Sequence, residues 1–131
     1  FENQVVAVKQ MASVLKHGGL LILAEGYANG FEKLSAIRKA VGLDALKPAA
    51  INFYSRYEEL APCLNEYFTY VDSIYLGSYD YLTRIVYPLI ATGDVDHNTQ
   101  YHELFSVLSK AFNPEAFNTL SRLRIDVLLR R

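Results

Sequence analysis

Three polar residues follow the most apolar segment of the chain, and they are the best candidates for a ligand site. Residues 20–24 are all apolar, and Glu25, Tyr27 and Asn29 come shortly after them. In open α/β sheets, ligands bind at the carboxyl ends of the strands. A carboxylate, a phenol and an amide at such an end predict a small-molecule site. The alternative interpretation is that Asn29 caps the next helix and Glu25 is only the first solvated residue, and both roles can coexist.

A second candidate is a tyrosine-rich segment that is predicted to be helical. Tyr81 and Arg84 are three residues apart and share one face of that helix, which also carries Tyr79 and Tyr87. Aromatic rings stack on planar molecules, and a guanidinium binds anions through forked hydrogen bonds. The segment therefore predicts a site for a planar or anionic small molecule. The alternative is that the tyrosines belong to the core and that the stem of the arginine covers them.

Metal and nucleophilic chemistry find little support in the sequence. His17, His97 and His102 are scattered over a turn, a loop and a helix, without the spacing of metal ligands. Cys63 is the single cysteine and lies on an apolar helical stripe, one turn from the acidic residues 58–59. Nearby carboxylates raise the pKa of a thiol, which favours a buried structural thiol over a nucleophile. No metal site, disulfide or catalytic triad is predicted.

Nucleotide and phosphate sites are not predicted either. Gly18 and Gly19 precede their strand, whereas a nucleotide-binding loop follows one. Gly26 and Gly30 have neither dinucleotide-binding nor P-loop spacing. The arginines near the carboxyl terminus are Arg122, Arg124, Arg130 and Arg131. They could contact phosphate, but a solvated strand end is the commoner outcome.

Composition predicts one compact domain over residues 1–131. The chain is 51% hydrophobic and 21% charged, with a formal net charge of -1 at pH 7. A chain of this length forms a core without disulfides or metals, and so balanced a charge excludes the basic footprint of nucleic-acid binding or of a polybasic membrane anchor. The longest apolar run is too short to span a bilayer and no signal peptide is present, so we expect a cytoplasmic protein. The start at Phe1, without methionine, predicts a processed, excised or truncated chain.

Helix and strand signals alternate along the chain, which predicts an α/β fold. An amphipathic helix over residues 5–15 ends at the glycines 18–19. Residues 20–24 are apolar at every position, which is typical of a strand covered on both faces, as in a parallel sheet. A second helix begins with Asn29 as its cap and ends at Gly42.

The alternation continues after this helix. Ser55 and Glu58 have the spacing of a capping box and predict a third helix that tolerates Pro62. Residues 69–76 are rich in β-branched and aromatic side chains and predict a strand, followed by a turn at 77–78.

The last third of the chain is predicted to hold two helices and a strand. The first helix covers residues 79–91 and kinks or ends at Pro88. A loop over 92–98 leads to a helix around 104–112. The final strand, 123–129, alternates in hydropathy and should be half buried, with one wetter face. That wetter face carries Arg122, Arg124 and Asp126.

One segment resembles a known family. Residues 14–26 have the sequence VLKHGGLLILAEG. This run resembles the helix-to-strand passage of class I S-adenosylmethionine-dependent methyltransferases, commonly V-L-K-P-G-G followed by an apolar strand. His17 replaces the usual proline, but both glycines of the turn are present. The resemblance implies that 20–24 is the fifth strand of a seven-stranded sheet, with 69–76 as the sixth and 124–130 as the seventh.

The same resemblance implies an arrangement of the strands. In that family the seventh strand is antiparallel and lies between the fifth and the sixth. This chain is therefore expected to form a partial Rossmann-like sheet of three adjacent strands, the last one antiparallel and central, with flanking helices. The outer edge of the strand at 20–24 would be unpaired, and an unpaired apolar edge is a template for another chain. We expect a homodimer through that edge.

The function implied by the resemblance is that of the carboxyl-terminal, substrate-side portion of a methyltransferase acting on a small molecule. In the complete family fold, S-adenosylmethionine is held by a glycine-rich turn after the first strand and an acidic residue ending the second, and neither is in this sequence. The chain alone is expected to bind no cofactor and to be inactive or nearly so. Asn52 and Tyr54, in the loop before the third helix, would face the substrate. The alternative is that this loop packs its aromatic ring and hydrogen-bonds its own backbone.

A second class of function is also compatible with these features. The chain would then be a stand-alone, non-catalytic α/β module that self-associates through the open strand edge and binds a small ligand or a protein. Neither interpretation involves nucleic acid or a membrane. The reading frame upstream of Phe1 separates them, because a strand with a glycine-rich turn favours the enzyme and a nearby start codon favours the module.

Overall fold

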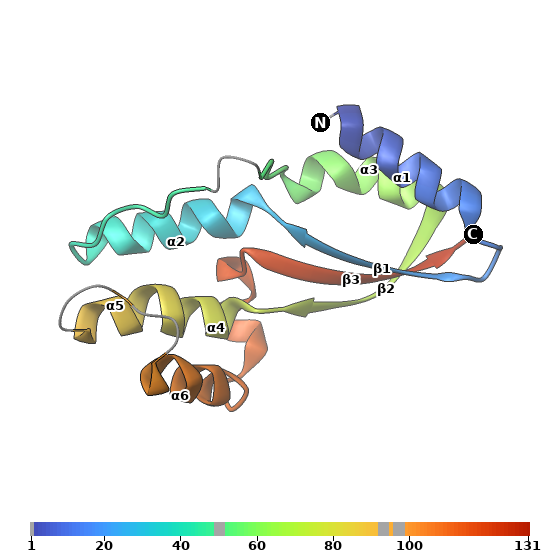
Figure 1. Ribbon diagram of the computed structural model, residues 1–131. Coiled ribbons are helices and arrows are strands. Elements are labelled where there is room, and N and C mark those ends of the chain that lie inside the picture. Colours follow the sequence, from blue (N-terminus) through green and yellow to red (C-terminus); the bar gives the residue numbers. More distant parts are fainter. Residues whose placement is uncertain (1, 49–51, 92–94, 96–98) are drawn as a thin grey trace.

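The computed structural model describes residues 2–48, 52–91, 95 and 99–131 as a mixed α/β fold (Figure 1). Helices cover one face of a three-stranded sheet, and further helices lie beyond one end of the strands (Figure 1). In chain order the elements are α1 (Glu2–Val14), β1 (Leu20–Gly26), α2 (Ala28–Ala40), α3 (Tyr57–Tyr67), β2 (Phe68–Tyr75), α4 (Gly77–Tyr81), η1 (Leu82–Val86), α5 (Tyr87–Ile90), α6 (Gln100–Ser109), η2 (Pro114–Leu120) and β3 (Leu123–Arg130). The loop predicted over 92–98, with His97, lies outside the described residues except for residue 95.

The strand order in the sheet is β1-β3-β2, and β3 is antiparallel to both of its neighbours. Leu20 pairs with Leu129 and Gly26 with Leu123, so β1 is paired along its whole length. The pairing of β2 with β3 shifts by one residue at a bulge between Tyr70 and Asp72. The prediction that the last strand is antiparallel and central is therefore confirmed. Within the described ranges, the outer edge of β1 has no partner strand.

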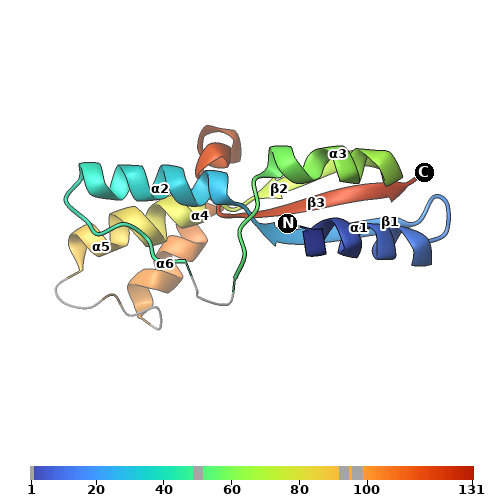
Figure 2. The same ribbon diagram turned by 90° about the horizontal axis from the view of Figure 1, so that it is seen from above.

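Helices α1 and α3 run side by side over one face of the sheet (Figure 2). Gly18 ends the turn between α1 and β1 with φ of 75°, a conformation that side chains rarely adopt. Its N–H donates to the carbonyl of Arg130 at 2.8 Å, which joins the turn to the end of β3. The resulting core is built by Val8, Ala12, Leu23, Tyr27, Leu60, Leu64, Phe68 and Leu128.

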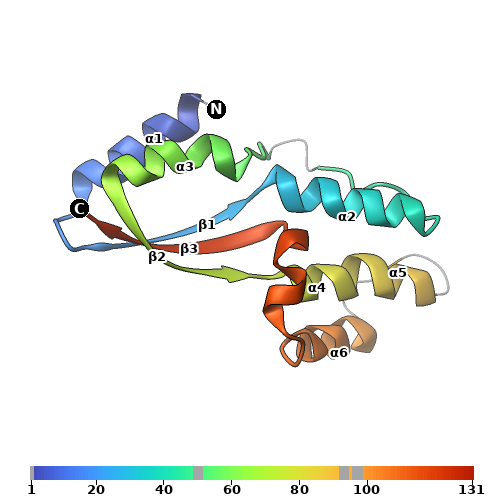
Figure 3. The same cartoon turned by 180° about the vertical axis from the view of Figure 1, so that it is seen from behind.

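The opposite face of the sheet is uncovered by any described element (Figure 3). Leu20 is 59% exposed and Ile22 is 68% exposed on β1, and Ile74 is exposed on β2. The prediction that the first strand is covered on both faces is therefore wrong for this chain. The reason is that α1 and α3 both lie on the side of Leu23, whereas the other helices lie beyond the strand ends (Figures 1 and 3).

The two faces of β3 are the reverse of the sequence expectation. Asp126 is fully buried and Leu128 is 3% exposed on the helix-covered side. Leu129, on the apolar set of alternate positions, is exposed on the uncovered side. The predicted half-buried strand is present, but its polar residues point into the core because helix α3 covers that side and nothing described covers the other.

Two predicted helix caps are wrong. Asn29 lies inside α2, whose N-cap residue is Tyr27, and α3 follows Arg56 rather than being capped by Ser55. The reason is an isolated parallel bridge between Tyr27 and Ser55, in which the N–H of Ala28 donates to the carbonyl of Ser55 at 2.9 Å. This bridge fixes both segments as extended chain and places the amino-terminal ends of α2 and α3 together.

The helix predicted over 79–91 ends at Ile90, so Pro88 lies in its last turn. Elements α4, η1 and α5 follow one another without a break, and η1 is π-helical, with the N–H of Tyr87 donating to the carbonyl of Leu82. Pro88 has no N–H for the carbonyl of Arg84, four residues earlier. That carbonyl accepts a hydrogen bond from the guanidinium of Arg38 on α2. The proline therefore contributes to a contact between two helices.

Two glycines allow helices to pack against η2 and the residue after it. A Cβ on Gly30 of α2 would collide with the backbone carbonyl of Ser121, and one on Gly77 would collide with that of Phe117. A turn was predicted at residues 77–78, but Gly77 begins α4 directly after β2. The elements beyond the strand ends, which we call the helical cluster, are α2, α4, η1, α5 and α6. The two glycines allow this cluster to pack against the chain that leads into β3. Its own apolar core is formed by Leu82, Tyr87 and Phe105.

Candidate functional site

The carboxyl end of β1 opens into a pocket of about 400 Å³, which we call the strand-end pocket. Three of the predicted site residues, Glu25, Asn52 and Tyr54, line it together. The other lining residues are Gly26, Phe53, Arg122 and Leu123. A cavity of this size accommodates a small molecule, and its lining offers a carboxylate, an amide, a phenol and a guanidinium.

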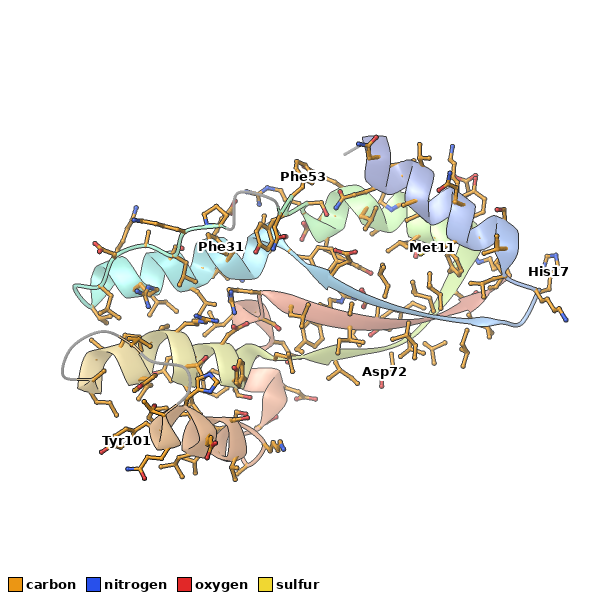
Figure 4. The ribbon with its side chains drawn as sticks, in the orientation of Figure 1. Met11, His17, Phe31, Phe53, Asp72 and Tyr101 are labelled. Atoms are coloured by element: carbon orange, nitrogen blue, oxygen red, sulfur yellow. The ribbon has the colours of Figure 1, made fainter. Side chains whose placement is uncertain are left out.

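Tyr54 is fixed by its neighbours on two sides. Its ring lies 2.7 Å from the position that a Cβ on residue 26 would take, so only Gly26 leaves room for it. Phe31 stacks on the ring with centroids 5.5 Å apart, and the amide of Asn52 donates to its hydroxyl at 3.2 Å. Figure 4 shows Phe31 and Phe53 near the junction of α2 and β1. The aromatic ring therefore packs against its surroundings and still lines the pocket.

Arg122 supplies the positive charge of the strand-end pocket. Its Nε and its backbone N–H both donate to the carboxylate of Asp80 at 2.8 Å, and Nη2 forms an ion pair with the same group at 2.8 Å. Asp80 is 1% exposed, at the start of α4. A buried carboxylate that accepts several charge-assisted hydrogen bonds holds its partner in one geometry. The expected role of Arg122 as part of a solvated strand end is therefore wrong.

Tyr27 and Asn29 line a different cavity of about 230 Å³, which we call the tyrosine pocket. It lies between α2, α3, η2 and the strands, and it shares no lining residue with the strand-end pocket. Asn29 donates to the carboxylate of Glu58 at 3.0 and 3.1 Å and accepts from the N–H of Tyr57 at 3.4 Å. The hydrogen bond from the backbone of Glu58, followed by that from Asn29, lowers the pKa of the Glu58 carboxyl. Asn29 thus stabilises the first turn of α3 rather than its own helix.

A charged network lies behind the tyrosine pocket, on the covered face of the sheet. The Nε of Arg124 donates to Asp126 at 2.6 Å and to Ser73 at 3.0 Å. Its guanidinium also lies 3.7 Å from the ring centroid of Tyr57. Burial lowers the pKa of Arg124, but the carboxylate of Asp126 more than offsets this and the net shift is upward. Burial, followed by the charge of Asp126, raises the pKa of the Tyr27 hydroxyl, which therefore stays protonated.

Tyr81 and Arg84 line neither of these pockets. The ring of Tyr81 packs against Phe117 with centroids 5.1 Å apart, as the core interpretation expected. Burial, followed by the charge of Arg122, lowers the pKa of the half-buried Arg84 guanidinium. The structure therefore separates the predicted site residues into three in the strand-end pocket, two in the tyrosine pocket and two in the helical cluster.

Two further side chains singled out by the sequence, Cys63 and Arg130, lie outside both pockets. Burial, followed by the charge of Glu66, raises the pKa of the Cys63 thiol, which agrees with the predicted direction. Arg130 donates to the carbonyls of Ala12 and Tyr67, both at 2.9 Å, so it ties α1 to the end of α3. Among the described residues, no group of three His, Cys, Asp or Glu side chains is arranged as metal ligands would be.

Sequence reasoning named Arg122 and Arg124 only as possible phosphate contacts and missed their buried carboxylate partners. The partner of Arg122 is Asp80, 42 residues away in the chain, and no local pattern joins them. Arg124 and Asp126 offered a better signal, because residues two apart in a strand share one face. Opposite charges on one face of a central strand are typical of a paired, buried network.

The sequence matches no protein-family model and no curated protein. Over the described ranges, no helix combines the length and the apolar character that a membrane span requires.

Proposed function

We propose that the chain is the carboxyl-terminal, substrate-side portion of an S-adenosylmethionine-dependent methyltransferase that acts on a small molecule. The observation that carries this proposal is the strand order β1-β3-β2 with an antiparallel, central last strand. This is the order that the resemblance of residues 14–26 implies for the last three strands of such an enzyme. Helix, two-glycine turn and β1 also follow one another as that resemblance expects.

The uncovered surfaces of the sheet support the same proposal. A complete sheet would place a further strand on the free edge of β1 and a further layer on the face that exposes Leu20 and Ile22. Apolar side chains on a central strand are favourable only when both faces are covered. The bare face and the bare edge adjoin one another on β1, as they would if a single missing part covered both.

The strand-end pocket would hold the methyl acceptor. Glu25, Asn52 and Arg122 offer hydrogen bonds of both polarities, and the Tyr54 ring offers a flat wall. Methyl transfer requires an acceptor that is aligned with the donor, so a fixed set of hydrogen bonds is the main contribution that this part would make. Glu25 would accept a proton or a hydrogen bond from the acceptor.

The residues of this chain do not fit S-adenosylmethionine itself. A cofactor-binding turn requires glycines whose backbone is open to the ligand, but Gly26 is covered by the ring of Tyr54 and Gly30 by the backbone of Ser121. Cofactor binding is therefore proposed for a part outside this sequence.

Calorimetric titration tests the proposal directly. The chain of residues 1–131 is expected to release no binding heat with S-adenosylmethionine, whereas a longer chain extended by the upstream reading frame is expected to bind it. In that longer chain, Glu25→Gln should lower methyl transfer to an accepted small molecule and leave cofactor affinity unchanged. Micromolar affinity of the 131-residue chain, or an upstream frame without a strand and glycine-rich turn, would contradict the proposal.

A second candidate function is favoured by the free edge of β1. The chain would be a non-catalytic module in which two copies pair through this edge, which brings the exposed Leu20 and Ile22 of the two copies next to each other on the bare face. Light scattering should then give the mass of a dimer. Ile22→Lys should give a monomer, and Val14→Lys, on the exposed side of α1, should leave the dimer intact. A monomeric mass for the parent chain would exclude this function.

A further inference from the structure

We propose that the tyrosine pocket binds an uncharged aromatic ring that carries a hydroxyl group, a ligand of the phenol class. The pocket is separate from the strand-end pocket and shares none of its residues, so this proposal does not rest on methyl transfer. It is lined by Tyr27, Tyr57, Tyr75, Arg124 and Asn118, together with residues at its rim. Its volume of about 230 Å³ suits a single substituted ring rather than a larger molecule.

The walls of the pocket are flat and aromatic. Tyr27 and Tyr57 meet edge to face, with centroids 5.5 Å apart and planes at 88°. The guanidinium of Arg124 lies 3.7 Å from the centroid of Tyr57 and 5.3 Å from that of Tyr75. Because the arginine already occupies the cation position beside these rings, a second cation is disfavoured. A neutral ring can still pack against the remaining edges and faces.

Two polar atoms of the lining residues are buried without a hydrogen-bond partner among the described residues. These are the hydroxyl of Tyr27 and the Oδ1 of Asn118. Tyr27 is 4% exposed, so its hydroxyl belongs to the wall of the pocket and not to the outer surface. A buried polar group without a partner is unfavourable, and native proteins retain few of them. A ligand hydroxyl seated against Tyr27 would accept from its O–H, and one seated against Asn118 would donate to its amide oxygen.

The charges around the pocket favour a neutral ligand. Arg124 is paired with Asp126 at 2.6 Å, so its charge is already compensated. At the rim, Lys33 and Glu58 are exposed and of opposite sign. A ligand carboxylate would meet the buried carboxylate of Asp126 behind the arginine, which is unfavourable. Burial keeps Tyr27 protonated, so it acts as a donor across the physiological range.

Titration of the 131-residue chain with p-cresol, followed by amide chemical shifts, tests this inference. Residues that line the tyrosine pocket should shift, and residues of the strand-end pocket should not. Benzoate and 4-methylcyclohexanol are the matched probes for charge and for flatness, and each should bind at least about fivefold more weakly. Absence of p-cresol binding, tighter binding of benzoate, or shifts confined to the strand-end pocket would overturn the proposal.

The variant Tyr27→Phe separates a ligand role from a structural one. It removes only the unpartnered hydroxyl, so the melting temperature of the free protein should rise by a few degrees, about 2–6 °C. The same change should weaken p-cresol binding about fivefold, because one hydrogen bond to the ligand is lost. Asn118→Ala should weaken it by a similar factor. Tyr101→Phe, at an exposed position on α6, should change neither quantity. Unchanged affinity in both pocket variants would overturn the proposal.

Discussion

A charged pair lies on the buried face of the sheet and large apolar residues lie on its exposed face, which is the opposite of what hydropathy predicts. The face under α1 and α3 buries the charged pair Arg124 and Asp126, whereas the bare face exposes Leu20 and Ile22. Burial in this molecule is thus decided by which side the helices cover, and only secondarily by the polarity of each residue. An apolar face without cover is unfavourable in water, so the difference also indicates where a further part or a second copy would pack.

The charged face is tolerated because the Oδ1 of Asp126 is held by two donors, although its Oδ2 is buried without a partner among the described residues. Asp126 accepts hydrogen bonds from Arg124 and from the hydroxyl of Ser73, and the arginine stacks on Tyr57. A buried charge pair is stable when geometry is good, but removal of one partner leaves an uncompensated charge in the core. The bare face has no comparable dependence, because each of its side chains contacts water.

The largest expected effect is therefore that of Asp126→Ala. The variant leaves the guanidinium of Arg124 buried without its carboxylate, and the free energy of unfolding should fall by about 3–5 kcal/mol. Urea denaturation measures the loss. The control is Asp72→Ala on β2, whose side chain points away from the helices (Figure 4), with an expected change within about 0.5 kcal/mol. Equal effects of the two variants would show that the covered face has no special dependence on its charges.

Two neighbouring residues of β1 compare the faces directly. Leu23 faces the helices and is 7% exposed, whereas Ile22 lies on the bare face and is 68% exposed. Leu23→Ala should lower the free energy of unfolding by about 2–4 kcal/mol, because it leaves a cavity in the core. Ile22→Ala should cost less than about 1 kcal/mol in the monomer. A large effect of Ile22→Ala in dilute solution would mean that the bare face is covered there.

The covered face should also respond to alkaline pH through Tyr27. Burial raises the pKa of this hydroxyl above its ordinary value of 10.0, so the folded state binds its proton more tightly than the unfolded state. Its contribution is complete below about pH 10 and is lost as the pH rises further. Tyr27→Phe should therefore flatten the fall in unfolding free energy between pH 9 and 11. A slope equal to that of the parent chain and of Tyr101→Phe would contradict this expectation.

The smallest expected effect concerns Asn29 and the exposed carboxyl of Glu58. A backbone hydrogen bond is the largest cause that lowers the pKa of Glu58, the amide of Asn29 is the second, and the charges of Arg56 and Arg124 add to them. The associated stability is present above the ordinary pKa of 4.5 and is lost as the pH falls through the lowered value. Asn29→Ala should move the pKa of Glu58 upward, as measured by NMR titration of its carboxyl carbon. An unchanged pKa would show that the Asn29 amide does not contribute to the shift.

The elements of the sheet could be predicted because their signals are local. The apolar stripe of α1, the glycine turn at Gly18 and the uniformly apolar β1 each depend on a few adjacent residues. The exposed face of β3 could not be predicted from its alternation, since a period of two shows that the faces differ but not which one the helices cover. The cap assignments of Asn29 and Ser55 failed for a related reason, because a bridge between distant segments decided both ends.

Part of the strand-end pocket could be predicted, because only some of its residues are placed by local sequence. Glu25 follows its strand directly, so its place at the carboxyl end was fixed by local sequence. Asn52 and Tyr54 came to the same place only through the resemblance, and the structure brings them to line the pocket with Glu25. Arg122 could not be found, because its orientation depends on a carboxylate 42 residues away.

The hydrogen bond between Arg38 and the carbonyl of Arg84 joins α2 to η1. Its acceptor is open because residue 88 is a proline. An ordinary residue at position 88 would offer an amide hydrogen to that oxygen and compete with the guanidinium for it. The contact between α2 and η1 would then be weaker, and α2 would be held less firmly without any change in the sheet. A residue that commonly interrupts a helix thus leaves a carbonyl oxygen open for the contact with α2.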